Sequence, residues 1–431
     1  MVPAPLKVLI IGSGGREHGL VLALSRDPEV DKIYAAPGNP GISEQATCAP
    51  IEPTSIQHLR TFAIEQHIDL TVVGPEAPLG LGIVDSFRAH NLKIFGPSQN
   101  AARIETSKSF AKDLCTQFHI PTPRWKMFTS ESEAIGALDG FGPPWVVKAD
   151  GLAAGKGTTV TRNKREAEAA IHRELQREPG RIVLEEFIDG WEATFMATVS
   201  KGQVQWLTPV FQDYKPLSDG DAGPNTGGMG CFTPIPTVTP SLVEKVRGSI
   251  LSPVVAAMEK VGVHYQGVLN LNAIVRRGSE EPFMLEFNAR FGDPEGQGAV
   301  MLVEKGLASH LSSVAEDLDV AEPPQCRQGV CVVVVLASKG YPASPTTGDK
   351  IMIRPVPDEN VTFLHAGTSK NSSGELVTAG GRVLNVVATG DSVERARKAA
   401  YSTIKSSVQF KGMQYRTDIG AHRARRRELA S

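Results

Sequence analysis

The residues best suited to chemistry lie in one stretch, residues 286–297, with the sequence Glu-Phe-Asn-Ala-Arg-Phe-Gly-Asp-Pro-Glu-Gly-Gln. The apolar residues 283–285 before it predict a strand, and side chains alternate between the two faces of a strand. Glu286 and Asn288 then point the same way and offer two hard oxygen ligands suited to Mg²⁺. Arg290 has the same parity, so a cation site and an anion-binding guanidinium would face one point. The alternative is a solvated polar strand end.

Composition describes an ordinary globular chain. It has 431 residues, of which 41% are hydrophobic and 21% charged, with a net charge of −2. This length predicts roughly two to four domains. The small net charge predicts no attraction to nucleic acid or to a membrane surface. The longest notable apolar run, residues 330–337, is far shorter than the roughly 20 residues of a membrane helix and reads as a buried strand. No signal peptide is expected.

The cysteines indicate a reducing compartment. Their number is odd, they are scattered, and no C-x-x-C motif occurs; they are Cys48, Cys115, Cys231, Cys326 and Cys331. We therefore expect a cytoplasmic protein without structural zinc.

A glycine-rich turn near the N-terminus separates an expected strand, residues 7–11, from an expected helix that begins near residue 20. Backbone N–H groups at such a helix start favour a phosphate. The dinucleotide fingerprint G-x-G-x-x-G fails because its sixth position is Glu17, and the second strand, residues 32–35, has no acid at its end. The pattern therefore excludes a nicotinamide site and favours a smaller phosphate ligand. The alternative is a turn that needs glycine for its geometry alone.

The following segments alternate between helix and strand. Residues 56–66 and 84–90 are expected to be helical, and residues 70–73 and 93–95 to be strands. This order predicts an open parallel sheet that binds ligands at the carboxyl ends of its strands. Loop 37–41 and Glu76 belong to those ends, although each could also be only a turn.

A second set of segments supplies lysines. Residues 101–118 are expected to form one helix that carries Lys108. Lys148 lies inside an apolar strand, where a buried ammonium needs a partner, and Asp150 is the candidate. Residues 151–158 resemble a P-loop but have only three residues between the glycines, and Gly157 in place of a hydroxyl after Lys156. They predict a glycine-rich flap that closes over phosphates through backbone N–H groups and Lys156.

The remaining segments complete two further units. The strand 181–184 ends in residues 185–192, where backbone could pair with an adenine edge and a carboxylate with a ribose; the alternative is an acidic loop. Residues 219–230 form a glycine-dense loop that is either disordered or functional. A hairpin, helices to about residue 318 and a small α+β unit follow; their strands are residues 267–275, 282–288, 330–336 and 380–387, and the last helix is 393–404. The basic end, residues 422–427, is expected to be a solvated helix end.

Taken together, these segments resemble the glycinamide ribonucleotide synthetase (phosphoribosylamine–glycine ligase) family of ATP-grasp enzymes in de novo purine synthesis. The resemblance rests on Gly14-Gly15-Arg16-Glu17-His18, Ala36-Pro37-Gly38-Asn39, Val73-Gly74-Pro75-Glu76-Ala77-Pro78, Lys93-Ile-Phe-Gly-Pro97, Lys148-Ala-Asp-Gly-Leu-Ala-Ala-Gly-Lys-Gly157, Gly223-Pro-Asn-Thr-Gly-Gly-Met-Gly230, Glu286-Phe-Asn288, Arg290-Phe-Gly-Asp-Pro-Glu295 and His365-Ala-Gly-Thr368. The chain departs from the family at Ala289, at Gly296 and at Asn270-Leu271-Asn272, where the family usually has Cys, a side chain and Tyr-Ala-Gly.

The resemblance implies a multidomain α/β and α+β fold with an N-terminal open parallel α/β sheet, a two-lobed ATP-grasp fold and a small C-terminal α+β domain. The implied units are an N-terminal substrate domain (1–103), a linking helix (104–122), an ATP-grasp lid (123–190), an ATP-grasp core with the metal site (191–325) and a C-terminal domain (326–431). The implied partners are ATP, Mg²⁺ or Mn²⁺, glycine and 5-phosphoribosylamine, with the chain a monomer or weak dimer.

The resemblance also implies roles for individual residues. ATP would contact Lys108, Lys148, Gly155, Lys156, Gly157, Glu185, Glu186, Phe187, Ile188 and Glu192. The other substrates would contact Gly14, Gly15, Arg16, Glu17, Pro37, Asn39, Glu76, Asp213, Asn225, Thr226, Gly227, Arg290, Gly292 and Asp293. Glu286 and Asn288 would bind the metal, and Arg290 and Lys156 would be catalytic.

The implied chemistry is activation of glycine as glycyl phosphate, followed by attack of the amine of phosphoribosylamine. Rival interpretations are another ATP-grasp ligase with a different carboxylate and amine, and a non-enzymatic nucleotide sensor. We expect Glu286 to bind no structural partner. If the strand from residue 267 pairs with that of Glu286, Asn272 lies either at the metal or against a neighbouring side chain.

Overall fold

The structure is a computed structural model that describes residues 5–152, 157–320, 322–327, 329–356 and 358–421.

The N-terminal unit is an open parallel sheet. The parallel strands are arranged in the order β3-β2-β1-β4-β5. They are β1 (Leu6–Gly12), β2 (Val30–Pro37), β3 (Thr47–Cys48), β4 (Leu70–Val73) and β5 (Ile94–Phe95), with helices α1 (Gly15–Ser25), α2 (Ile56–Glu65), α3 (Glu76–Gly80) and α4 (Ile83–Arg88). This confirms the expected parallel sheet.

The lid is a four-stranded antiparallel sheet in the order β6-β9-β7-β8. Its elements are β6 (Trp125–Phe128), α7 (Glu131–Ala137), β7 (Trp145–Ala149), β8 (Thr158–Thr161), α8 (Lys164–Leu175) and β9 (Ile182–Glu185). Apolar side chains of both helices and the sheet, such as Ala134, Ile171 and Leu184, form a small core of the lid's own.

The core unit is a second antiparallel sheet, in the order β11-β10-β16-β17. Its strands are β10 (Gly190–Ser200), β11 (Gln203–Leu207), β16 (Gly267–Arg276) and β17 (Pro282–Asn288). The nearby elements are α5 (Gln99–Thr106), α6 (Lys108–Gln117), α9 (Pro240–Val246), α10 (Ser252–Lys260), α11 (Glu295–Met301), β18 (Val303–Lys305), α12 (Leu307–Ala315) and β19 (Gln325–Cys326). The expected hairpin of β16 and β17 is confirmed.

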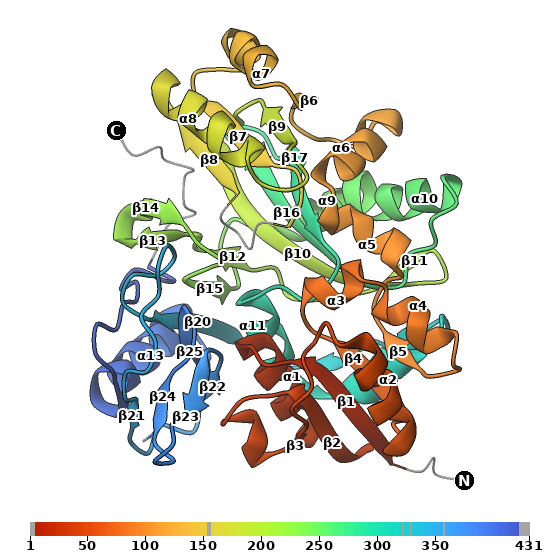
Figure 1. Cartoon of the computed structure of the whole chain (residues 1–431), viewed down its shortest axis with the longest axis vertical. Helices are drawn as coiled ribbons and strands as arrows, with labels where there is room; N and C mark the ends of the chain where they lie inside the picture. The colour runs from red at the N-terminus through yellow and green to blue at the C-terminus, as the bar shows by residue number, and fades with distance from the viewer. Residues whose placement is uncertain (1–4, 153–156, 321, 328, 357, 422–431) are drawn as a thin grey trace.

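The C-terminal sheet has the order β12-β15-β20-β25-β22. It contains β12 (Gln212–Asp213), β15 (Gly230–Thr233), β20 (Val330–Ala337), β22 (Val361–His365) and β25 (Arg382–Gly390), with α13 (Val393–Ser407) against it. Small ribbons pair β13 (Pro216–Ser218) with β14 (Ala222–Asn225), β21 (Met352–Ile353) with β26 (Val408–Gln409), and β23 (Thr368–Lys370) with β24 (Leu376–Thr378). Two strands from the core segment, β12 and β15, thus belong to the C-terminal sheet. Figure 1 shows the lid at the top, the N-terminal sheet at the lower right and the C-terminal sheet at the lower left.

Two segments differ from expectation. The single helix predicted over residues 101–118 is wrong, because Ser107 has extended backbone (φ −139°, ψ 105°) and its side chain caps α6 by accepting from the Phe110 N–H. Lys108 therefore begins a new helix. The glycine-dense stretch 219–230 contains the paired strand β14. No helix among the residues described is long and apolar enough to cross a membrane.

Candidate active site

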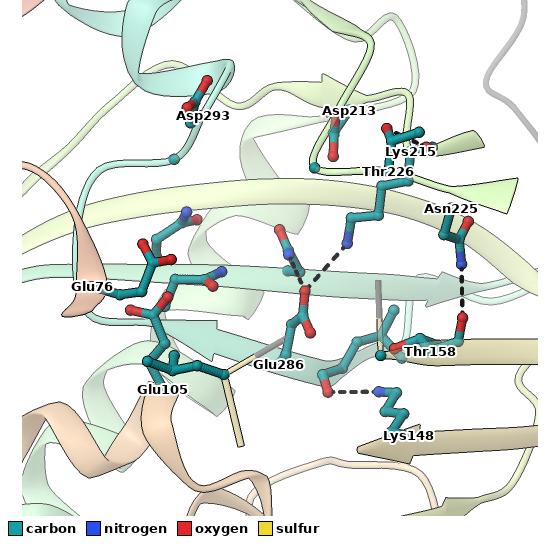
Figure 2. Close-up of a pocket in the computed structure, with 18 of the residues that line it drawn as sticks. Glu76, Glu105, Lys148, Thr158, Asp213, Lys215, Asn225, Thr226, Glu286 and Asp293 are labelled. Carbon is teal, nitrogen blue, oxygen red and sulfur yellow. Dashed lines mark hydrogen bonds and ion pairs between the residues drawn. The ribbon is translucent and has the colours of Figure 1, made fainter. Parts of the chain in front are cut away.

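One cavity of about 950 Å³ is lined by all four units. The N-terminal unit contributes Glu76 at the start of α3, the lid Lys148, the core Glu286 and the C-terminal sheet Arg382. Figure 2 shows the labelled side chains of Glu76, Lys148, Asp213 and Glu286 around this space. A ligand that fills this cavity would contact residues of all four units. Its binding would therefore depend on how the four units are arranged.

The strand expected to bind the metal, β17 with Glu286 and Asn288 (here called the metal strand), faces this cavity. Both Glu286 and Asn288 line it, and on the neighbouring strand Asn272 lies opposite Glu286 while Asn270 lies opposite Asn288. Glu286 Oε1 accepts from Asn272 Nδ2 at 2.8 Å and from Lys215 Nζ at 3.4 Å (Figure 2). The expectation that Glu286 has no structural partner is therefore wrong.

Charge keeps Glu286 ionised. Burial alone would raise the pKa of this carboxyl, but the ammonium groups of Lys215, Lys108 and Lys148 together hold the pKa well below its usual range. The same attraction raises the pKa of Lys215 against the effect of its own burial.

These two oxygen donors fit a cation that arrives with a phosphate ligand. Within the described ranges, no group of three or more His, Cys, Asp or Glu side chains could hold a metal ion. Mg²⁺ is usually bound through one or two carboxylates together with substrate phosphates and water. An ionised carboxylate and an amide oxygen beside several lysines match that pattern.

Lys148 has a partner other than the one expected. Its Nζ lies 2.9 Å from Glu185 Oε2 and donates to the Leu285 carbonyl at 3.1 Å. Lys112 Nζ lies 3.1 Å from the other oxygen of Glu185. Asp150 instead lies 3.1 Å from Arg181 Nε, so the predicted pairing of Asp150 with Lys148 is wrong. The carboxylate of Glu185 is thus enclosed by two lysines, which lower its pKa against the effect of burial.

The other residues expected at ATP divide into three groups. Lys108, Gly157 and Glu192 line the cavity, and Lys108 Nζ donates to the Gly151 carbonyl at 2.9 Å. Gly155 and Lys156 lie outside the described residues. The described lining does not include Glu185, Glu186, Phe187 or Ile188.

Arg290 is held by two carboxylates. Its Nη2 lies 3.0 Å from Glu105 Oε1, and its Nε lies 3.4 Å from Glu76 Oε2. Burial would lower the pKa of the guanidinium, but these carboxylates raise it. The second oxygen of Glu105 accepts from the Ala289 N–H at 2.7 Å. The guanidinium therefore has a fixed position beside the metal strand.

The backbone of the glycine turn before α1 donates a hydrogen bond to the side chain of Glu17, a residue of α1 itself. Glu17 Oε2 accepts from the Gly14 N–H at 2.6 Å, and Glu17 Oε1 accepts from Arg16 Nε at 2.6 Å. Gly14, Arg16 and Glu17 line the cavity. Gly15 faces the C-terminal sheet, because a Cβ there would lie 2.0 Å from Asn385 Nδ2.

Pro37 and Asn39 are not among the described residues that line the cavity. Asn39 Nδ2 donates to the carbonyls of Ser13 and His365, at 2.8 and 2.9 Å. Asn39 therefore ties the glycine turn to the C-terminal sheet.

The segments expected to close the site do meet around it. Asp213, Asn225, Thr226, Gly227, Gly292 and Asp293 all line the cavity. Asn225 Nδ2 donates to the Thr158 carbonyl of the lid at 3.3 Å (Figure 2). Arg382 Nη1 donates to the Gly227 carbonyl at 2.6 Å, and its Nη2 lies 2.7 Å from Asp293 Oδ2.

One end of the cavity is rich in hydrogen-bond acceptors. Burial raises the pKa of Asp213 well above its usual range, and the nearby Glu295 carboxylate adds to this effect. Asn270 Oδ1 and Gln212 Oε1 are buried and have no hydrogen-bond partner among the described residues. Unpaired buried acceptors are costly, so this end suits a ligand that brings N–H groups.

Three family models cover most of the chain. The N, ATP-grasp (A) and C domains of phosphoribosylglycinamide synthetase match residues 6–105, 106–296 and 331–422. The chain belongs to the phosphoribosylglycinamide synthetase family. A relative named phosphoribosylamine–glycine ligase, from Ralstonia nicotianae, is 43% identical over 98% of this chain and 100% of its own length.

Solved structures agree with this family. The crystal structure of phosphoribosylamine–glycine ligase from Thermotoga maritima has a TM-score of 0.82 and 34% identity, covering 96% of this chain and 100% of its own. The biotin carboxylase domain of 2-oxoglutarate carboxylase from Hydrogenobacter thermophilus, in complex with MgADP and bicarbonate, has a TM-score of 0.73 at 16% identity. It covers 96% of this chain and 92% of its own, and shows a shared fold.

Several residues that line the cavity were not predicted from the sequence. They are Glu105, Lys112, Lys215, Asn270, Glu295 and Arg382. Lys215 lies between β12 and β13, and Arg382 is the first residue of β25; no local pattern links either residue to β17. A signal existed for Glu295, which lies in the stretch 286–297, and for Asn270, whose parity on a predicted strand placed it on the same face as Asn272.

The Glu185 cluster gives a stability prediction. Glu185→Gln should lower the free energy of unfolding by about 1 to 3 kcal/mol, because two buried lysines then lose a charged acceptor. The pKa of Glu185 is depressed in the folded state, so its stabilisation is present above its unfolded pKa, about 4.3, and is lost as the pH falls through the folded value. Urea unfolding at pH 7 and pH 4 should show a gap between wild type and variant that narrows in acid. Glu186→Gln, at the half-buried next residue, is the matched control, and an equal loss there would contradict this account.

Proposed function

We propose that this chain joins glycine to 5-phosphoribosylamine at the expense of ATP, giving glycinamide ribonucleotide, ADP and phosphate in purine synthesis. The observation that carries the site assignment is the pair of Glu286 and Asn288, which faces lysines across a cavity lined by all four units. Relatives matched over nearly their whole length are named for this ligase activity. ATP and a divalent metal are the cofactors of the ATP-grasp class, and Mg²⁺, or Mn²⁺ in its place, suits the oxygen donors here.

Activation of glycine comes first, because its carboxylate is a poor electrophile. A carboxylate oxygen attacks the γ-phosphorus and the bond to ADP breaks, which gives glycyl phosphate. Phosphoryl transfer depends on positioning and charge neutralisation. Lys108 and Lys148 supply positive charge, and Glu286 and Asn288 would hold the cation. When bound, the cation neutralises charge on the phosphates.

The second step joins the two substrates. The amine of phosphoribosylamine attacks the acyl carbon of glycyl phosphate, phosphate leaves, and the nitrogen loses a proton. Arg290, which lines the cavity and is fixed by Glu76 and Glu105, would stabilise the developing negative charge. Lys156 and the flap would close over the phosphates, and Asn225 already joins the β13–β14 ribbon to the lid. Closure excludes water that would hydrolyse the acyl phosphate.

The two ends of the cavity suit glycine and phosphoribosylamine, the two substrates other than ATP. We assign the glycine ammonium to the end with Asp213, Glu295 and the unpaired Asn270 oxygen, because these groups can accept its hydrogen bonds. We assign phosphoribosylamine to the side of Gly14, Glu76 and Asp293, toward the N-terminal sheet. The remaining expected contacts of both substrates stay proposals, as do the domain boundaries, a cytoplasmic location and a monomer or weak dimer.

The test is ADP release in three mixtures, with ATP alone, with ATP and glycine, and with ATP, glycine and phosphoribosylamine. We expect fast release and formation of glycinamide ribonucleotide only in the complete mixture with Mg²⁺. Release that needs a different carboxylate or amine would indicate another ATP-grasp ligase. Nucleotide binding without turnover in any mixture would indicate a sensor and would overturn the proposal.

A further inference from the structure

Three neighbouring strands of the core sheet carry polar side chains that are hydrogen-bonded in a row. Thr194 on β10 lies opposite Asn272 on β16, and Asn272 lies opposite Glu286 on β17. Asn272 Nδ2 donates to Glu286 Oε1 at 2.8 Å, and Thr194 Oγ1 donates to Asn272 Oδ1 at 3.0 Å. Thr194 and Asn272 are 2% and 6% exposed, so little water competes for these bonds.

The chemistry of the three side chains determines which atom donates each hydrogen bond between them. An ionised carboxylate only accepts hydrogen bonds, so the Asn272 amide must turn its NH₂ toward Glu286. The amide oxygen then faces Thr194, whose hydroxyl has a single proton to donate. A second acceptor, Glu295 Oε1, also lies 3.0 Å from Thr194 Oγ1. The Glu286 carboxylate therefore determines the orientation of the Asn272 amide, and the amide oxygen points at Thr194, whose single proton it shares with Glu295.

We propose that Asn272 and Thr194 are positioning residues that hold the Glu286 carboxylate in the orientation needed for the cation, and that neither binds the cation itself. The inference rests on the proposed function, because it requires Glu286 to be a metal ligand. Lys215 lies farther from the same carboxylate oxygen, at 3.4 Å, so the shortest bond that orients it comes from Asn272. Loss of such an outer partner typically lowers metal affinity about 10- to 100-fold.

The experiment measures the Mg²⁺ concentration that gives half of the Mg²⁺-dependent gain in ADP affinity, by calorimetry on the full chain. Asn272→Leu should raise this concentration about 10- to 100-fold and leave ADP affinity without Mg²⁺ unchanged. Thr194→Val should raise it less, because Asn272 keeps its bond to Glu286. Thr198→Val is the matched control: Thr198 lies on the same strand, bonds His310 at 2.8 Å and does not line the cavity, so no change is expected.

Asn272→Asp separates positioning from direct binding. If Asn272 only positions Glu286, the aspartate loses the donor and repels Glu286, so more Mg²⁺ is needed. If residue 272 faces the cation, the added charge lowers the requirement and overturns the inference, as would an unchanged titration in Asn272→Leu. Should the leucine variant not fold, the aspartate and Thr194→Val variants carry the test. A Glu286→Gln variant that titrates like wild type would refute the metal assignment itself and the inference with it.

Discussion

Glu286→Gln is expected to lower the turnover of the ligase reaction about 100- to 1000-fold while the protein stays folded. Glutamine keeps the size of the side chain and an oxygen acceptor but removes the charge that would bind the cation. Lys215, Lys108 and Lys148, which now share that negative charge, would then repel one another without it. Because the Lys215 side chain is 29% exposed, solvent should limit the cost to stability.

Steady-state assays over a range of Mg²⁺ concentrations and thermal unfolding without Mg²⁺ check this expectation. Glu192→Gln is the matched control, because Glu192 lines the same cavity and lies 3.8 Å from the same Lys215. It should change the KM for ATP and leave the Mg²⁺ requirement as in wild type. A large stability loss with normal turnover in Glu286→Gln would assign this residue to structure. Its pKa lies well below the usual value, so acidification to about pH 5 should not weaken this ligand.

Local patterns predicted the metal strand well. Alternation along residues 283–290 placed Glu286 and Asn288 on one face, and the expected hairpin placed Asn272 on the neighbouring strand. The register shows that Asn272 lies opposite Glu286. Both features depend only on neighbours in sequence. The apolar strands and glycine turns of the N-terminal sheet were predictable for the same reason.

The partners of the charged residues were not predictable from local patterns. The partner of Lys148 is Glu185, on an adjacent strand 37 positions later, because the sheet order β9-β7 decides which side chains meet. Asp150 was closer in sequence but turns toward Arg181 and Ser109. Ser107 ends one helix and caps the next, a local break that the apolar pattern around it concealed. Arg382 reaches the site only because the C-terminal sheet packs against the core.

Arg290→Met is expected to reduce the free energy of unfolding by roughly 3 to 5 kcal/mol, in addition to abolishing ligation. The Glu105 side chain is only 6% exposed and lies 3.0 Å from the guanidinium, so the variant leaves a buried charge without its partner. Arg290→Lys should lose less stability, because one ammonium replaces part of the charge, but it cannot contact Glu105 and Glu76 in the same geometry. Urea unfolding of both variants measures the difference.

A second substitution and a pH series show whether the unpaired carboxylate is the cause. Adding Glu105→Gln to Arg290→Met removes the buried charge and should recover much of the lost stability without recovering activity.

Burial already raises the pKa of Glu105, and loss of the guanidinium should raise it further. A raised folded pKa means that the penalty grows as the pH rises above the unfolded value, about 4.3, and is smallest where Glu105 is protonated in both states. The stability gap between Arg290→Met and wild type should therefore be wider at pH 8 than at pH 5. A gap that does not change with pH, or a double variant no more stable than the single one, would assign the loss to packing of the arginine side chain instead.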